Sequence, residues 1–410
     1  MSKCKIYMAA QQDDTKMAKA HIQAEQQINF KHNLRVNTSS LSLFWFGASF
    51  FAIRTICPLF LSYLTDNTLV FSILSVITST GWLLPQLFTA SWVQRQPVKK
   101  FIPVNVGFFS ERLPIMLLPL AAWIVLRSES FAVVLFLLLL TWHTVGAGVV
   151  AVGWQDMLAK IFPVEWRGRF FGITNFIGNG TGILGASAAA WILNKIKYPF
   201  NFMLTFGIAG LFIFLSWIFL SLTREPASVP EENPPDRKSY WRNLPNFIRD
   251  DKNYRQYLIS QALSSIGVMT LGFLTLYVLR KWGVGASMVS LFTTSMFGGS
   301  ALSSLVFGWI GDKIGHKLVI EISNVLIGLA ILIALLAPSP AWFYLVFALQ
   351  GGASAGFILS GISIIFELCD ENIRPTYIGL TNTVIGIFSG ISPLFGGWII
   401  DSLGFNWLFW

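Results

Sequence analysis

The chain has 410 residues, of which 54% are hydrophobic and only 12% are charged. Soluble domains carry about 25% charged residues, so this balance excludes an ordinary water-soluble fold. The apolar residues also run in blocks, without the alternation that marks half-buried helices and strands. We therefore predict an all-α protein whose helices cross a lipid bilayer.

The first forty residues are polar and lack the apolar core of a signal peptide, so residues 1–40 are predicted to be a cytoplasmic tail. A bilayer is crossed by about 20 helical residues. Six blocks of about this length predict an N-terminal six-helix bundle over residues 41–222. Their expected bounds are 41–64, 68–92, 104–126, 131–155, 169–193 and 201–222.

Residues 223–255 are first proline-rich and then charged, with aromatic residues at helical spacing. This pattern predicts a cytoplasmic linker that contains a helix in the membrane interface. Residues 256–410 are predicted to form a C-terminal bundle with spans at about 256–279, 286–310, 317–336, 341–366 and 377–400. We expect a twelfth span to begin at Asn406, with most of it beyond Trp410. The alternative is an eleven-span protein whose last tryptophans anchor it in the interface.

Most of the 29 Lys and Arg residues fall in the tail, in the linker and in the loops on their side of the membrane. Cytoplasmic loops carry such an excess, so we predict a multi-pass protein of the plasma (inner) membrane with its N-terminus and central linker inside. The net charge of +9 then reflects topology, and no nucleic-acid partner is expected. Cys4, Cys57 and Cys369 are too far apart to suggest a metal cluster, and no cofactor is predicted.

Two segments of the chain resemble each other when one is shifted by 207 positions. GITNFIGNGTGILGASAAAWI starts at Gly172, and GLTNTVIGIFSGISPLFGGWI starts at Gly379. Their Asn and Trp residues coincide, and an Arg precedes each segment by five positions. Parallel halves of this kind recur in secondary transporters. The repeat therefore predicts two bundles of the same architecture.

The loop after the eighth predicted span reads GWIGDKIGHK. It resembles the signature loop of the major facilitator superfamily, commonly written G-x-L-a-D-r-x-G-r-k. The matching residues are Gly308, Gly311, Asp312, Lys313, Gly315 and Lys317. The resemblance implies twelve helices in two six-helix bundles. Glycines let helices approach closely, and an acid beside a helix end can pair with nearby cations as a conformational latch.

The corresponding loop of the first half, ASWVQRQPVKK, departs from this pattern because Gln94 stands where the acid is expected. A latch in this half would therefore use Asp156, at the end of the fourth span. By similarity to the family's connection between spans four and five, Arg167 belongs to the same device. Glu367 and Arg374 hold the similar positions in the second half.

Charged groups at membrane depth cost about 2.5–3.5 kcal/mol on insertion scales, so each is a candidate functional group. Arg54 lies near the middle of the first span, which the resemblance places beside a central cavity. Its guanidinium is predicted to bind an anionic group of the substrate through paired hydrogen bonds. The alternative is an arginine that snorkels outward or binds a carbonyl.

His143 lies near the centre of the fourth span, also a cavity helix by resemblance, and is a candidate for binding substrate or carrying a proton. A buried neutral histidine that is satisfied by a backbone carbonyl is the alternative. Glu111, in the third span, is the best acid for proton coupling, and an interhelix salt bridge is its structural alternative. We expect no pair between Glu111 and Arg112, because neighbours on an α-helix point about 100° apart.

Amide side chains within the spans complete the predicted binding site. They are Gln86, Asn175, Gln261, Gln350 and Asn382. Such side chains also hold membrane helices together, which is the structural alternative for each of them.

These features predict a monomeric secondary active transporter of a small molecule that works by alternating access. Two versions stay open: proton-coupled efflux of amphiphilic compounds, and uptake of a polar solute such as a sugar. The chain has no GxxxxGK[ST] motif and no HExxH motif, so neither ATP drive nor an embedded enzyme is predicted. A sensor or scaffold that moves no solute is the remaining alternative.

Overall fold

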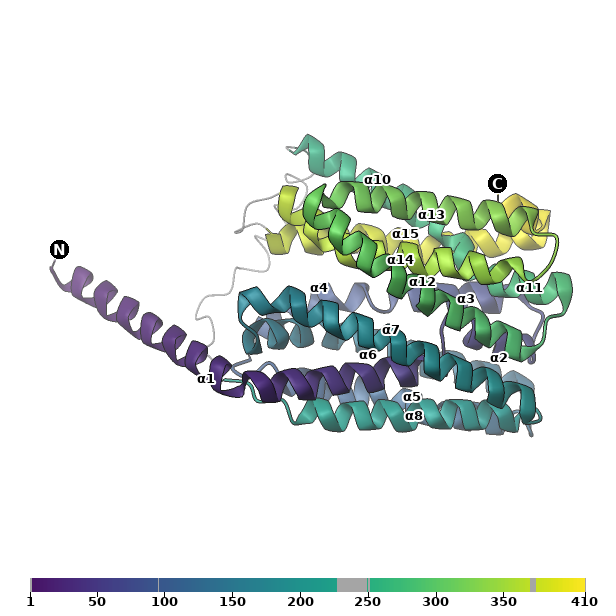
Figure 1. Ribbon diagram of the computed structural model, residues 1–410, viewed down its shortest axis with the longest axis horizontal. Coiled ribbons are helices and arrows are strands. Elements are labelled where there is room, and N and C mark those ends of the chain that lie inside the picture. Colours follow the sequence, from purple (N-terminus) through teal and green to yellow (C-terminus); the bar gives the residue numbers. More distant parts are fainter. Residues whose placement is uncertain (1, 95, 227–248, 250, 369–373, 410) are drawn as a thin grey trace.

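The computed structural model describes residues 2–94, 96–226, 249, 251–368 and 374–409 (Figure 1). The elements within these ranges are all helical, which confirms the all-α class. Ten helices among these residues are long and apolar enough to cross a membrane. The predicted linker helix and the rest of residues 227–248 lie outside the described residues.

The first half of the chain contains α1 (Ser2–Ser49), α2 (Ile56–Ser62), α3 (Thr68–Thr80), α4 (Leu84–Gln94), the π-helical turns η1 (Ile102–Val106) and η2 (Phe108–Arg112), α5 (Leu113–Ile124), α6 (Glu129–Ile161), α7 (Val164–Lys195) and α8 (Phe200–Ser221). The second half contains α10 (Lys252–Val268), η3 (Met269–Gly272), α11 (Leu274–Trp282), α12 (Ala286–Lys313), α13 (His316–Leu336), α14 (Trp342–Leu368), α15 (Arg374–Leu403) and α16 (Phe405–Phe409). Adding 207 to the bounds of α7 gives 371–402, close to those of α15.

The helices pack as two groups that lie side by side (Figure 1). In the first group α1 packs against α7 and α8, and in the second α14 packs against α12 and α13. The groups meet along two pairs of helices, α7 with α12 and α3 with α15. This arrangement confirms the two-bundle architecture that the repeat predicts.

The predicted tail is continuous with the first span, because α1 runs unbroken from Ser2 to Ser49. Asn33 lies buried where α1 crosses the end of α8. Its Nδ2 donates to the Arg224 carbonyl at 2.8 Å, and its Oδ1 accepts from the Arg224 backbone N–H at 2.9 Å. These polar residues therefore satisfy free backbone groups beyond the end of α8. We call this side of the molecule the tail face.

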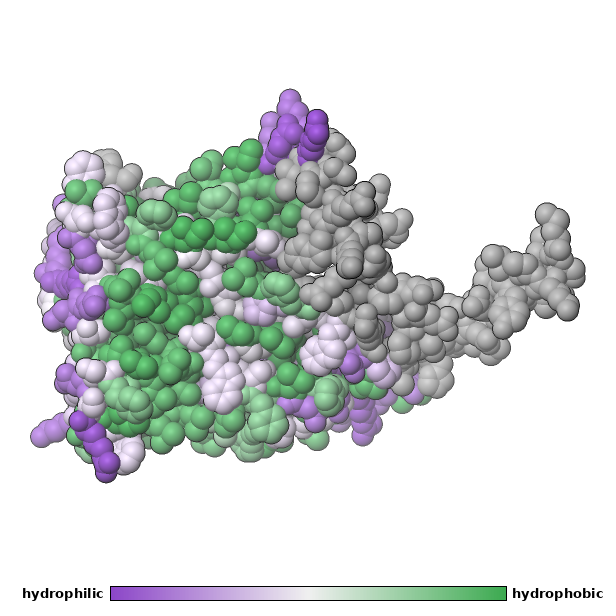
Figure 2. All heavy atoms as spheres, turned by 180° about the vertical axis from the view of Figure 1, so that it is seen from behind, coloured by the Kyte–Doolittle hydropathy of each residue, from purple (hydrophilic) through white to green (hydrophobic). Residues whose placement is uncertain are grey.

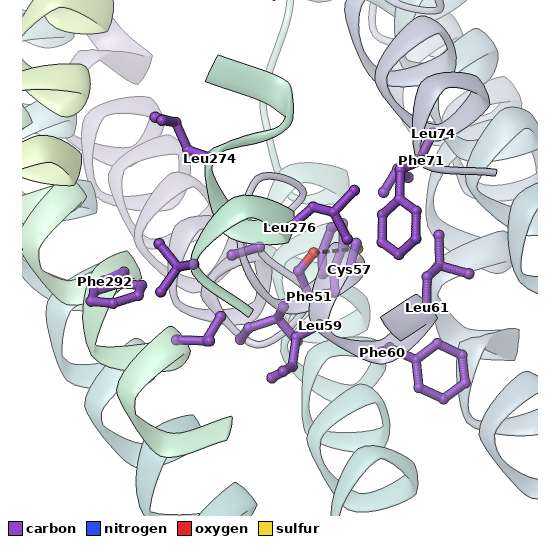
Figure 3. Close-up of a cluster of buried hydrophobic side chains, with 14 of the residues drawn as sticks. Phe51, Cys57, Leu59, Phe60, Leu61, Phe71, Leu74, Leu274, Leu276 and Phe292 are labelled. Carbon is purple, nitrogen blue, oxygen red and sulfur yellow. Dashed lines mark hydrogen bonds between the residues drawn. The ribbon is translucent and has the colours of Figure 1, made fainter. Parts of the chain in front are cut away.

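The predicted span at 41–64 is not one continuous helix. Helix α1 ends at Ser49 and α2 begins at Ile56, and we call residues 50–55 the break. The Ala52 carbonyl accepts from the backbone N–H groups of Thr55 and Cys57, both at 3.1 Å. The Cys57 thiol donates to the Phe51 carbonyl at 3.0 Å, inside a cluster of buried apolar side chains (Figure 3). The seventh span is interrupted in a similar way at η3.

The surface has the polarity that a membrane protein needs. Figure 2 shows a broad hydrophobic band that is bordered by hydrophilic side chains at the left edge, with further hydrophilic patches beside the grey atoms at the right. Large apolar side chains are exposed on the helices, including Leu184 and Trp191 of α7 and Leu302 and Leu305 of α12. Exposed apolar area on this scale is stable only against lipid. The chain is therefore a multi-pass membrane protein.

Candidate functional site

The break carries polar groups to the place where the two bundles meet. Arg54 Nη1 donates to Ser354 Oγ of α14 at 3.3 Å, and the Arg54 carbonyl accepts from Thr275 Oγ1 of α11 at 2.6 Å. The hydroxyl groups of Thr55 and Thr293, which lies on α12, share a further hydrogen bond. We call Arg54, Thr55, Thr275, Thr293 and Ser354 the break cluster.

Arg54 brings an uncompensated positive charge to this cluster. It forms no ion pair with any carboxylate of the described part of the chain. A guanidinium has five N–H donors, of which Ser354 uses one. The residue as a whole retains some exposed surface at this position. The arrangement is therefore suited to an anion.

Gln350 adds a second unsatisfied group on the same helix as Ser354. Its side chain is fully buried, and neither Nε2 nor Oε1 has a hydrogen-bond partner. A buried polar group left unpaired costs about 1–3 kcal/mol. Residues four apart on a helix share a face, so Gln350 and Ser354 leave α14 in similar directions. Of the sequence-predicted residues, Arg54 therefore contacts α14 at Ser354, and Gln350 lies one helical turn away on the same helix.

A second buried cluster joins the third and fourth spans. His143 Nδ1 lies 2.7 Å from the backbone carbonyl of Glu111. A carbonyl only accepts, so Nδ1 carries the hydrogen and Nε2 is left as the basic atom. The imidazole edge also meets the ring of Phe51, with 5.5 Å between the centroids. Phe51 belongs to the break and lies three positions before Arg54 in the sequence. The chain itself therefore connects the two clusters.

Glu111 and Arg112 form an ion pair with each other, so the prediction that they do not pair is wrong. Both residues lie in the π-helical turn η2, where the wider coil reduces the angle between successive side chains. Both are also buried, at 7% and 6% exposure, so each charge needs a partner close at hand. The Arg112 Nε–H has no hydrogen-bond acceptor.

The other amide residues of the predicted binding site form no hydrogen bond with the break cluster in the described part of the chain. Gln86 Nε2 donates to the Trp82 carbonyl, in the turn before α4, at 2.8 Å. Gln261 Nε2 donates to the Tyr257 hydroxyl at 2.7 Å, within one helix. Asn175 and Asn382 are partly buried on α7 and α15. For Gln86 and Gln261 these bonds favour the structural alternative.

The signature loop forms a tight turn between α12 and α13. Gly315 has φ of +124°, a conformation that favours glycine, and the Gly311 backbone lies against the His316 ring. Lys317 Nζ lies 3.7 Å from Glu321, and both side chains are exposed. Gly308 and Lys313 lie on the last turns of α12. The side chains of Asp312, Arg167, Glu367 and Arg374 lie outside the described residues, and the latch stays a prediction.

The first-half loop obtains a carboxylate from Glu225, which the sequence analysis missed. The Glu225 side chain is fully buried and accepts from the backbone N–H groups of Lys99 and Lys100 at 2.9 and 2.6 Å. It also pairs with Lys160 Nζ at 2.9 Å. Burial lowers the pKa of Lys100, and the Glu225 charge opposes this effect. We call these contacts the Glu225 strap.

Asp156, the acid predicted for this half, is exposed and lies 3.7 Å from Lys99 Nζ. It therefore reaches the same loop as Glu225, but with a weaker contact. A single acid directly after the sixth span, in the sequence TREP, was the only signal that could have pointed to Glu225.

Two similar helical bundles are an architecture that recurs in secondary transporters. The model of the Major Facilitator Superfamily matches residues 257–410. An uncharacterized MFS-type transporter of Methanocaldococcus jannaschii is 26% identical over 62% of this chain and 63% of its own length. The human MFS-type transporter SLC18B1 is 24% identical over 62% of this chain and 56% of its own length. The second half of the chain therefore matches the major facilitator superfamily, and the chain is similar to proteins named as its transporters.

A crystal structure of the nucleoside transporter NupG, solved for a mutant of that protein, has the same fold. Its TM-score is 0.70, with coverage of 92% of this chain and 94% of that chain. The identity is 12%, so the likeness concerns the fold alone. The matches to the archaeal and human relatives span less than two thirds of those proteins.

Proposed function

We propose that the chain is a secondary active transporter that moves a small solute by alternating access. The observation that carries this proposal is the position of the contacts between the bundles. Ser290 Oγ donates to the Ala186 carbonyl at 2.9 Å, and Ser187 Oγ lies 3.4 Å from Thr294 Oγ1. These residues lie toward the ends of α7 and α12 that are remote from the tail face.

Contacts of this kind close the molecule on one face while the site stays at its centre. The break cluster lies at the junction, with partners in both bundles. Rocking the bundles about this junction would open the closed face and close the tail face. A solute bound at the break cluster would then interact with both bundles at once.

The experiment that tests the proposal uses the purified chain in liposomes. A thermal-shift screen across solute classes first finds compounds that stabilise the protein, and counterflow then measures their exchange. We expect at least one stabilising solute to exchange across the membrane. If stabilising solutes bind but none exchanges, the sensor or scaffold hypothesis replaces the transporter.

We also propose that the tail and the central linker are cytoplasmic at the plasma (inner) membrane. The face that is closed by the contacts between α7 and α12 is then the outer face. Single cysteines placed at Arg242, Lys313 and Arg127 test this orientation with an impermeant thiol reagent on intact cells. We expect labelling at Arg127 alone, and labelling at Arg242 or Lys313 would reverse the orientation.

Transport is proposed to be linked to protons through His143 and Glu111, in the efflux of amphiphilic compounds. The support is structural contact: the His143 imidazole touches the break through Phe51. His143→Gln keeps a donor for the Glu111 carbonyl and removes the titrating ring. In liposomes this variant should retain counterflow without a pH gradient and lose gradient-driven accumulation. Full gradient-driven transport in the variant would exclude His143 as the proton carrier.

A further inference from the structure

We propose that the break cluster binds the carboxylate of an organic monoanion, an inference that rests on the proposed transport function but is tested by binding alone. The first support is the guanidinium of Arg54. Its planar fork matches the two oxygens of a carboxylate, and a single neutral hydroxyl, that of Ser354, bonds to it. An arginine kept at membrane depth without an acid has its charge available for a ligand.

The charge balance of the centre favours a monoanion. Glu111 and Arg112 neutralise each other, so Arg54 leaves one net positive charge in this part of the described chain. A single carboxylate cancels that charge, whereas a dianion such as a phosphate monoester leaves an excess negative charge in a low-dielectric setting. Burial of an uncompensated charge is strongly unfavourable.

The hydroxyl groups of the break cluster already take part in hydrogen bonds. The Thr275 hydroxyl donates to the Arg54 carbonyl, and Thr55 and Thr293 bond to each other. Gln350, one helical turn from Ser354, has an unused donor and an unused acceptor. Its side chain has no exposed surface in this conformation, so α14 must move before the amide can meet a ligand.

These features divide the recognition between two residues. Arg54 holds the carboxylate, and Gln350 pairs with a further polar atom of the ligand once the site has closed around it. Arg54 is therefore expected to govern the choice between charged and neutral compounds. Gln350 is expected to govern affinity without changing that choice.

The test measures thermal stabilisation of the purified full-length chain in detergent. The probes are acetate, lactate and benzoate, each compared with its neutral amide: acetamide, lactamide and benzamide. Inorganic phosphate is the dianion probe. The variants are Arg54→Gln, Arg54→Lys and Gln350→Leu, with Arg127→Gln as the control because Arg127 packs over the Trp123 ring, away from the cluster.

We expect at least one carboxylate to stabilise the wild type more than its amide does. Arg54→Gln should weaken its apparent affinity at least tenfold, and Arg54→Lys should weaken it less. Gln350→Leu should weaken it while keeping the preference for acid over amide, and Arg127→Gln should behave as the wild type. If Arg54→Gln does not fold, the comparison of each acid with its amide in the wild type and in Arg54→Lys still tests whether the break cluster prefers a carboxylate.

Two results would overturn the inference: equal effects of every carboxylate and its amide, or a stronger effect of phosphate than of any carboxylate. Survival of the carboxylate effect in Arg54→Gln would remove Arg54 from the site. A carboxylate that binds through Arg54 but is not exchanged in liposomes leaves this inference standing and contradicts transport. If only a neutral solute is exchanged, the transport proposal stands and this inference is contradicted.

Discussion

The ion pair of Glu111 and Arg112 is buried inside the first bundle, where each charge depends on the other. Removing one partner of such a pair costs about 3–5 kcal/mol, because the remaining charge is left unpaired. Glu111→Gln should therefore lower the stability of the protein by an amount in this range. Chemical denaturation in detergent measures the effect.

The double variant Glu111→Gln and Arg112→Gln supplies the matched control for this pair. It removes the buried charge altogether, so it should be more stable than the single Glu111→Gln variant. If the single variant is as stable as the wild type, the two side chains do not form a buried pair. If the double variant is less stable than the single variant, Arg112 stabilises the protein by contacts other than its pair with Glu111.

At this scale the sequence identifies charged groups but not their partners. Arg54 and His143 stand out because charges and imidazoles are rare within the apolar blocks. For His143, the bond to the Glu111 carbonyl is the contact that the structural alternative predicted. The partners Ser354 and Thr293 lie 300 and 238 positions from Arg54 and Thr55. No local pattern connects residues so far apart.

Between elements, the closest packing in the second bundle is that of α12 against α14. A Cβ at Gly299 would overlap the backbone carbonyl of Ala348, whereas a Cβ at Gly298 would meet open space. Gly299→Ala should therefore push the helices apart and cost about 1–3 kcal/mol. Gly298→Ala should be neutral or slightly stabilising, since alanine favours the helix. Thermal unfolding of the two variants gives the comparison, and equal stability would contradict the close approach.

The Glu225 strap ties the loop before η1 to the ends of α6 and α8. Glu225→Ala should expose the backbone N–H groups of Lys99 and Lys100, which now donate to the carboxylate. Hydrogen–deuterium exchange should then be faster at these two amides. Glu321→Ala is the matched control, because Glu321 pairs with Lys317 in an exposed position. Exposed pairs contribute about 0–1 kcal/mol, so this control should change nothing. Unchanged exchange in Glu225→Ala would contradict the strap.

The helical elements follow from the sequence, but their interruptions do not. The run FAIRTI at the break contains neither glycine nor proline. Pro58, in the first turn of α2, lacks the N–H that would bond the Arg54 carbonyl in a continuous helix, but it does not predict that α1 stops as early as Ser49. At the interruption Arg54 and Thr55 contact α11, α12 and α14. These are tertiary contacts, so the local sequence does not predict them. The π-helical turn η2 that brings Glu111 and Arg112 together lies between Gly107 and Pro114, but neither residue specifies a π-helical turn.

For the whole molecule, a sequence-level argument succeeds because the bilayer restricts the possible folds. Apolar blocks must become helices when lipid surrounds them, and a repeat of 207 positions implies two similar bundles. The same constraint cannot tell which face of the molecule is closed. That property depends on contacts such as that of Ser290 with Ala186, which lie 104 positions apart in the sequence.

The closed face offers the most direct test of alternating access. Ser187 Oγ of α7 and Thr294 Oγ1 of α12 lie 3.4 Å apart, close enough that cysteines at these positions can approach the S–S distance of about 2.0 Å with small adjustments. In a background without the native cysteines, Ser187→Cys with Thr294→Cys should cross-link under mild oxidation. Counterflow should fall at least tenfold and return when a reductant is added.

The cross-link has a defined effect because it joins the bundles on one face only. Ligand binding measured from the tail face should persist in the oxidised protein, since the break cluster is untouched. Each single-cysteine variant should transport normally with and without oxidant, which separates the cross-link from damage by the substitutions. Unimpaired counterflow in the fully cross-linked protein would show that these ends of α7 and α12 stay together throughout the cycle. Solute would then have to cross without separation of the bundles at this face, and the rocking motion would be excluded.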